Sequence, residues 1–127
     1  MPVIDVLANR SYPKARVRKA IAAACREVAK AVGIKPGQVW VRFQPGRAED
    51  YWEGDGKAIE RRAVPLLVFV HMAKGRPPEK LRAVMKGVTV ALAGELDIAP
   101  DAVWVRLMEL DLTHVAQGGV TYAELRA

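Results

Sequence analysis

Cysteine and histidine are scarce in this sequence. Its 127 residues include one cysteine, Cys25, and two histidines, His71 and His114. A single cysteine excludes an intramolecular disulfide and a zinc site built on several thiolates. Two histidines far apart in the sequence argue against any other metal site. We therefore expect no metal site.

Long apolar runs are also missing. The longest apolar stretch without a formal charge, residues 63–73, is about half as long as a membrane-spanning helix. The first ten residues, MPVIDVLANR, contain no basic segment followed by a long apolar stretch and a small-residue cleavage site. These absences exclude a transmembrane protein and a secretory signal, and we expect the protein in the cytoplasm.

Aromatic residues are few: three Trp, three Tyr and two Phe. A small RNA-binding sheet domain needs aromatic residues on exposed strands for base stacking, whereas the strand-like segments here are rich in Val and Leu. The net charge of +6 favours anionic partners, but much of the positive charge falls in residues 14–30, where it fits a solvated helix face. A nucleic-acid-binding module is kept only as an alternative from another functional class.

What the chain does contain is an internal repeat. The segment GIKPGQVWVRF (33–43) returns 64 residues later as DIAPDAVWVRL (97–107). Each half should therefore form the same supersecondary unit. The length and the 51% hydrophobic content fit one globular domain. We expect a single domain, residues 1–127, made of two fused units of about 1–62 and 63–127.

Apolar spacing predicts a strand, a helix and a strand in each unit. Apolar residues spaced by three or four predict the helices: Val17, Ile21, Ala24, Val28 and Val32 in the first unit, and Leu81, Val84, Val88, Leu92 and Leu96 in the second. Strand candidates are residues 2–8, 39–43, 64–71 and 103–108. The strands of such a unit are usually parallel, with a right-handed helical crossover. The predicted fold class is therefore α+β in two layers, with duplicated β-α-β units forming a four-stranded sheet and two helices on one face.

The segment VPLLVFV, residues 64–70, is apolar at every position and predicts a central strand that is covered on both sides. Two helices cover only one face of a sheet, so the other face needs a partner. Copies of the same chain are the simplest partner, and we expect a homo-oligomer. Residues 45–62, rich in Gly and charge, are interpreted as a hairpin or long loop that joins the two halves.

The resemblance to a known family rests on a small set of features. Pro2 directly follows the initiator methionine, the unit is duplicated, a Gly-Arg-Pro turn occupies residues 75–77, and a Gly-Gly-Val run occupies residues 118–120. Together these resemble the tautomerase superfamily over nearly the whole chain. The similarity is to its fused two-unit members, such as malonate semialdehyde decarboxylase and cis-3-chloroacrylic acid dehalogenase, and to the single-unit 4-oxalocrotonate tautomerase. It implies a homotrimer and a cofactor-independent tautomerase or isomerase of small carboxylic acids.

The resemblance implies a site around Pro2. Removal of Met1 would expose the secondary amine of Pro2, which would act as a general base in keto-enol tautomerisation of a small unsaturated 2-keto or 2-hydroxy carboxylate. Arg76 is the second catalytic candidate, because a guanidinium binds a carboxylate and lowers the pKa of a nearby amine. Lys74, Arg106 and Trp52 are the candidates for substrate binding, the first two as cations and Trp52 as an aromatic wall.

One departure from the family pattern leaves alternatives open. The decarboxylase pattern has an aspartate where this sequence has Gln38, and glutamine cannot act as a base. A protonated Pro2 could still serve as an acid in a decarboxylase, hydratase or dehalogenase of a three-carbon acid. The assisting carboxylate would come from elsewhere in the chain, namely from Asp50, Glu53, Glu109 or Asp111. A catalytically silent oligomeric scaffold is the other alternative. Pro65 is taken as the internal counterpart of Pro2, without a free amine.

Overall fold

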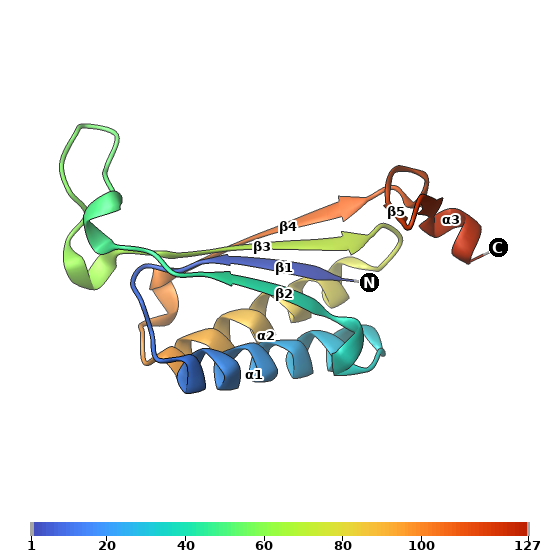
Figure 1. The fold of residues 1–127 in the computed structure, drawn as a ribbon, viewed down its shortest axis with the longest axis horizontal. Helices are drawn as coiled ribbons and strands as arrows, with labels where there is room; N and C mark the ends of the chain where they lie inside the picture. The colour runs from blue at the N-terminus through green and yellow to red at the C-terminus, as the bar shows by residue number, and fades with distance from the viewer. Residues whose placement is uncertain (1, 127) are drawn as a thin grey trace.

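The computed structural model describes residues 2–126 (Figure 1). Each half begins with a strand, a helix and a strand. The first half holds β1 (Val3–Leu7), α1 (Lys14–Val32) and β2 (Trp40–Gln44), and the second holds β3 (Leu66–Ala73), α2 (Pro78–Leu96) and β4 (Val103–Leu110). The chain ends in the short strands β5 (Ala116–Gln117) and β6 (Val120–Thr121) and the one-turn helix α3 (Tyr122–Leu125). The predicted units are confirmed, with strand bounds within two residues of those expected.

The four long strands form one sheet in the order β2-β1-β3-β4. Within each half the strands are parallel, β1 with β2 and β3 with β4, whereas β1 and β3 join the halves in antiparallel fashion. Both long helices cover the same face of this sheet (Figure 1). The predicted α+β class and the central place of the 64–70 segment are therefore confirmed.

Alternating side chains explain which sheet face the helices cover. In β3 the residues Leu66, Val68, Val70 and Met72 have no exposed surface, while the residues between them are partly exposed. Val28 of α1 and Val88 of α2 are equally buried and complete this core. The helices bury one stripe each and keep their charged residues on the solvent side, as amphipathic helices do. Within residues 2–126, no helix has the length and apolar character needed to span a membrane.

The repeat includes the strands of both halves, and the strand pairing sets its register. Val3 pairs with Trp40 in the first half, and Leu67 pairs with Trp104 in the second. Positions 64 residues apart are therefore equivalent, which makes Leu66 the counterpart of Pro2. The interpretation of Pro65 as that counterpart is wrong by one residue, because side chains in a strand alternate between faces and only Leu66 shares the face of Pro2.

The second face of the sheet is open in one chain. It carries the Trp40 and Trp104 side chains, and each of these residues is 49% exposed. The Trp104 ring packs edge-on against Phe69, with 5.7 Å between ring centroids. Arg42 and Arg106 lie on the same face. This mixture of large aromatic and cationic side chains is typical of a surface that binds a partner.

Candidate functional site

The candidate active site lies at the end of the sheet where β1 begins, and we call this the Pro2 end. Pro2 is buried, and its carbonyl oxygen accepts a hydrogen bond of 3.0 Å from the backbone N–H of Trp40. Val3 pairs with His71, so the adjoining Pro2 lies beside Met72 on the neighbouring strand. The N-terminus, the β3–α2 turn and the C-terminal segment all lie at this end of the sheet in Figure 1.

Arg76 and Lys74 both lie in the turn that follows β3, at the Pro2 end. The half-buried Arg76 donates from Nη1 to the carbonyl oxygen of Ala73, at 3.2 Å. Burial lowers the pKa of the Arg76 guanidinium, and the positive charge of Arg126 lowers it further. The backbone N–H of Lys74 donates to Leu110 at 2.9 Å, while its side chain is exposed. Both candidates therefore lie at the same end as Pro2.

Arg126 is a further basic residue at the Pro2 end, and the sequence analysis did not predict it. It follows α3, a helix whose first turn is closed by a capping box between Thr121 and Glu124. Its backbone N–H donates to Tyr122 at 3.1 Å, and its charge acts on Arg76. Nothing in the repeated motif points to this position. The sequence offers only one signal, a basic residue shortly after the Gly118-Gly119 run.

Arg106 lies in the middle of β4 on the open face, opposite Phe69. Its counterpart in the first half, Arg42, pairs with Asp5 through two hydrogen bonds of 2.8 and 3.1 Å. Phe69 is the counterpart of Asp5, so the second half lacks the carboxylate that would hold Arg106. Among the described residues, Arg106 has no ion-pair partner. Its guanidinium is available for an external anion on the open face.

Trp52 lies at the opposite end of the sheet from Pro2. It forms an isolated antiparallel bridge with Ala58 in a hairpin, and it is 60% exposed. It borders a hollow with Leu7 and Leu67, which lie where β1 ends and β3 begins. The hairpin projects from this far end in Figure 1. Within one chain, the structure therefore does not bring Trp52 together with Pro2.

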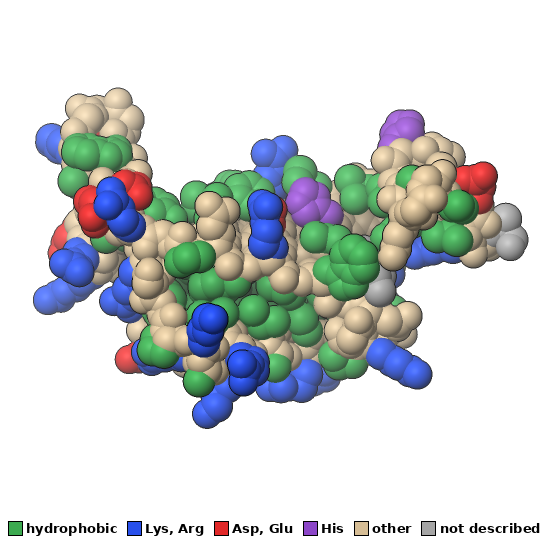
Figure 2. Space-filling model, in the orientation of Figure 1, with side chains coloured by type: hydrophobic (Ala, Val, Ile, Leu, Met, Phe, Trp, Pro, Cys, Tyr) green, Lys and Arg blue, Asp and Glu red, His purple; other side chains and the backbone are tan. Residues whose placement is uncertain are grey.

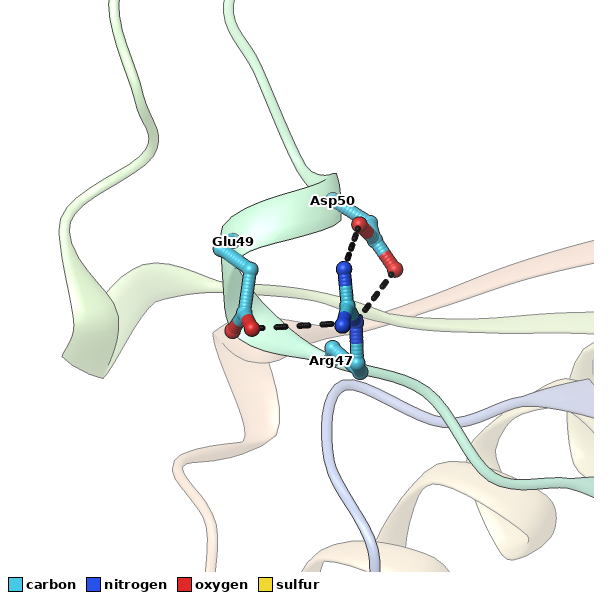
Figure 3. Close-up of polar contacts among 3 residues, drawn as sticks. All are labelled: Arg47, Glu49 and Asp50. Atoms are coloured by element: carbon cyan, nitrogen blue, oxygen red, sulfur yellow. Dashed lines mark hydrogen bonds and ion pairs between the residues drawn. The ribbon is translucent and has the colours of Figure 1, made fainter.

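One basic group at the far end of the sheet, Arg47, is paired with carboxylates of its own segment. Arg47 donates to both carboxylate oxygens of Asp50, at 3.2 and 3.3 Å, and its Nε lies 3.6 Å from Glu49 (Figure 3). Tyr12, the counterpart of Arg76, donates its hydroxyl to Asn9 at 2.7 Å. With Leu66 in the place of Pro2, this end has neither an amine nor a counterpart of the Arg76 guanidinium. The two ends of the sheet therefore differ in chemistry although they share a fold.

The carboxylates are also divided between the two ends. Gln38 accepts a hydrogen bond from the Lys35 backbone at 2.9 Å, which makes it part of a turn. Asp111 lies at the Pro2 end, where the hydroxyl and the backbone N–H of Thr113 hold the pKa of its carboxyl below the usual range. Glu109 lies beside it, near the end of β4. In the described part of the chain, no three His, Cys, Asp or Glu side chains gather in a way that could hold a metal ion.

Comparison with known proteins gives matches at the level of both sequence and structure. The family described as tautomerase enzyme matches residues 67–124. A probable tautomerase of Bradyrhizobium diazoefficiens (strain USDA 110) is 37% identical over 60 residues, which are 47% of this chain and 90% of that protein. The sequence match thus spans one repeat unit, the length of a single-unit relative.

Solved structures match the whole two-unit chain. The R7 fused 4-OT wild type, described as an asymmetric trimer, has a TM-score of 0.88 at 18% identity and covers 98% of this chain and 99% of its own. Malonate semialdehyde decarboxylase has a TM-score of 0.75 at 20% identity and covers 98% of this chain and 96% of its own. At identities this low, the structural similarity establishes the fold alone. It does so over nearly the whole chain.

Proposed function

Because the chain belongs to the tautomerase family, we propose that it is a cofactor-independent enzyme that tautomerises a small unsaturated 2-keto or 2-hydroxy carboxylate at Pro2. One observation carries this proposal. The buried Pro2 shares its end of the sheet with Arg76 and Arg126, whereas the equivalent position at the far end is Leu66, which cannot supply an amine. A base beside free guanidinium groups is the arrangement that an acidic substrate requires.

The chemistry begins when Met1 is removed and the Pro2 nitrogen becomes a secondary amine. A free α-amino group has a pKa of about 7.7 to 8.0, and burial and nearby cations both lower an amine's pKa. The neutral amine removes the proton of the enol hydroxyl, whose electrons form the carbonyl while the double bond shifts. The prolinium N–H then protonates the carbon at the other end of the conjugated system, and the keto acid leaves.

The cations have a separate task in this reaction, which is to hold the substrate. Arg76 presents two parallel N–H groups that match the oxygens of a carboxylate. Lys74 supplies a flexible positive charge near the same turn, and Arg106 is free to contact the distal part of a longer substrate from the open face. Positioning of this kind fixes the reacting atoms near the amine and accounts for much of enzymatic rate enhancement.

Trp52 enters the site only if two chains share it. The far end of one subunit, which carries Trp52, would then face the Pro2 end of a neighbour and place an aromatic wall over the substrate. The open sheet face with Trp40 and Trp104, and the trimeric state described for the similar fused 4-OT structure, support this arrangement. The proposed active form is a homotrimer.

A second candidate function uses the same residues with a protonated Pro2. The similarity to malonate semialdehyde decarboxylase and the position of Asp111 favour it as the alternative. Asp111 is held in its charged form at the Pro2 end and could orient water or a leaving carboxyl group. Gln38 in place of an aspartate weakens this candidate relative to tautomerisation.

The test combines intact-protein mass with assays of phenylenolpyruvate, 2-hydroxymuconate, malonate semialdehyde and the 3-chloroacrylates. We expect a mass without methionine and ketonisation of an enol acid. Pro2→Ala should lower kcat at least about 100-fold, and Pro65→Ala, which alters an amide nitrogen one residue from the counterpart position, should retain activity. Release of carbon dioxide or chloride instead would establish the alternative. A retained methionine with no turnover would overturn both and leave a silent scaffold.

A further inference from the structure

A cavity of about 540 Å³ lies between the first turns of α1 and the edge strand β2, at the far end of the sheet from Pro2. Its volume falls within the range of small-molecule sites. The family resemblance gives this region no role, and the sequence alone predicts a solvated helix face for the charges of α1. In Figure 2, blue basic side chains surround green apolar surface on the lower left of the molecule, where Figure 1 places the start of α1.

The walls of this cavity are apolar and aromatic. Val17 and Ile21 line it from α1, and Phe43 lines it from β2. Tyr12 stands edge-on to Phe43, with 6.4 Å between ring centroids and an angle of 78° between the rings. The Tyr12 hydroxyl donates to Asn9, which fixes the ring in place. A preformed edge-to-face pair beside aliphatic side chains favours a flat aromatic ligand.

The rim of the cavity is cationic. Lys14 and Arg18 line it, and the guanidinium of Arg10 lies 5.1 Å from the centroid of the Tyr12 ring. Within residues 2–126, none of these three has an ion-pair partner. The first turn of α1 contains no acidic residue, and Pro13 provides no side-chain cap. Positive charge therefore accumulates here without an internal counterion, and an anionic ligand would offset it.

From this geometry we propose that the cavity between α1 and β2 binds an aromatic carboxylate at a second site, distinct from the Pro2 site. The apolar walls hold the ring, and the Arg18 guanidinium binds the carboxylate with Lys14 as a second cation. The repeat shows that this site belongs to the first half only. Its Lys14 and Phe43 correspond to Pro78 and Leu107 in the second half, so each chain carries one such site.

The experiment is a calorimetric titration of the intact oligomer with 2-naphthoate. Neutral 2-naphthamide, which has the same rings without the charge, is the control ligand. We expect 2-naphthoate to bind and 2-naphthamide to bind at least about tenfold more weakly. Arg18→Gln should weaken 2-naphthoate binding by a similar factor, and so should Ile21→Trp, which fills the cavity. Arg82→Gln, at the equivalent position of α2, should leave the affinity unchanged.

The Arg76→Ala variant separates this site from the Pro2 site, since 2-naphthoate should bind it as it binds the wild type. Loss of binding in Arg76→Ala would move the ligand to the Pro2 end and overturn the proposal. Equal affinities for the acid and the amide would also overturn it, as would no binding of 2-naphthoate at millimolar concentration. Arg18 is exposed, so Arg18→Gln keeps the test decisive even if Ile21→Trp does not fold.

Discussion

Arg76 and Arg126 present the clearest problem at the scale of single residues. Two guanidinium groups come close enough for one to lower the pKa of the other, and within the described residues neither has a carboxylate partner. Two like charges placed close together repel each other unless an opposite charge offsets the repulsion. A substrate carboxylate that bridges both groups would remove the repulsion. We therefore interpret Arg76 and Arg126 as one carboxylate-binding site rather than two independent surface charges.

This interpretation predicts coupled effects of mutation. Arg76→Ala and Arg126→Ala should each raise KM for an acidic substrate about tenfold, which is the loss of one charge-assisted contact. Because both contact one carboxylate, the double variant should be less impaired than the product of the single effects. Initial-rate kinetics of the four proteins measure this coupling, with the exposed Arg82→Ala as the control. Strictly multiplicative effects would mean that the two residues bind separate groups.

The segment that carries Trp52 is held against the end of β1 at the backbone carbonyl of Ala8. Tyr51 donates its hydroxyl to the carbonyl oxygen of Ala8 at 2.8 Å. Gly46 lies against the same carbonyl, so closely that a Cβ atom there would overlap the Ala8 oxygen. The element that presents Trp52 thus depends on a position where only glycine fits without a backbone shift.

Gly46→Ala should therefore destabilise the protein by roughly 1–3 kcal/mol, the usual effect of overpacking. Gly54→Ala is the matched control, because it lies in the same segment and its Cβ would meet no atom within 4 Å. Urea denaturation of both variants measures the difference. Equal midpoints for the two variants would show that the loop moves away from Ala8 without loss of stability.

The last helix, α3, should respond to acid. The hydroxyl and backbone N–H of Thr121 donate to the Glu124 carboxylate and lower the pKa of that carboxyl. A carboxyl whose pKa is lower in the folded state stabilises the fold above its unfolded pKa, and this contribution is lost as pH falls through the folded value. We expect α3 to fray below pH 4.5, the ordinary value for a glutamic acid.

Amide hydrogen exchange of residues 122–125, measured between pH 3 and 6 and corrected for intrinsic rates, would detect this fraying. Glu124→Gln, whose amide oxygen can still accept both hydrogen bonds, should keep α3 protected and remove most of the pH dependence, whereas Glu124→Ala should give a loose α3 already at pH 6. Glu53→Gln, a carboxyl without such a cap, is the control. Protection of α3 that stays constant across this range in the wild type would contradict the proposed role of the capping box.

The repeat shows which elements sequence can predict. Apolar spacing predicted the helices and strands because each element buries one face locally, and the all-apolar 64–70 segment predicted the central strand. The antiparallel join of β1 to β3 did not follow from sequence, since it depends on how the halves meet. Pro65 is not the counterpart of Pro2, because strand pairing, and not the identity of two prolines, sets the register of the repeat. Arg126 was missed because its proximity to Arg76 arises only from the fold.

At the scale of the whole molecule, we expect the open sheet face to be buried between copies of the chain. Trp40 and Trp104 are large aromatic side chains on a face that no helix covers, and each is about half exposed. An aromatic side chain of this kind buries 150–250 Å² in an interface, on the order of other interface anchors. Assembly would also bring the far end of one chain, with Trp52, to the Pro2 end of another. Stability of the oligomer and activity should therefore be linked.

Trp104→Glu tests this link, because it places a charge on the open face, in the edge strand β4, and leaves the helix-facing core intact. Sedimentation at micromolar concentration should give a trimer for the wild type and smaller species for the variant. Turnover per chain of the variant should rise with protein concentration as subunits reassociate. Val90→Glu, on the outer surface of α2 where Val90 is 60% exposed, should change neither quantity. A wild-type protein that sediments as a stable monomer and is active at all concentrations would rule out a shared site, and Trp52 would then have no role at Pro2.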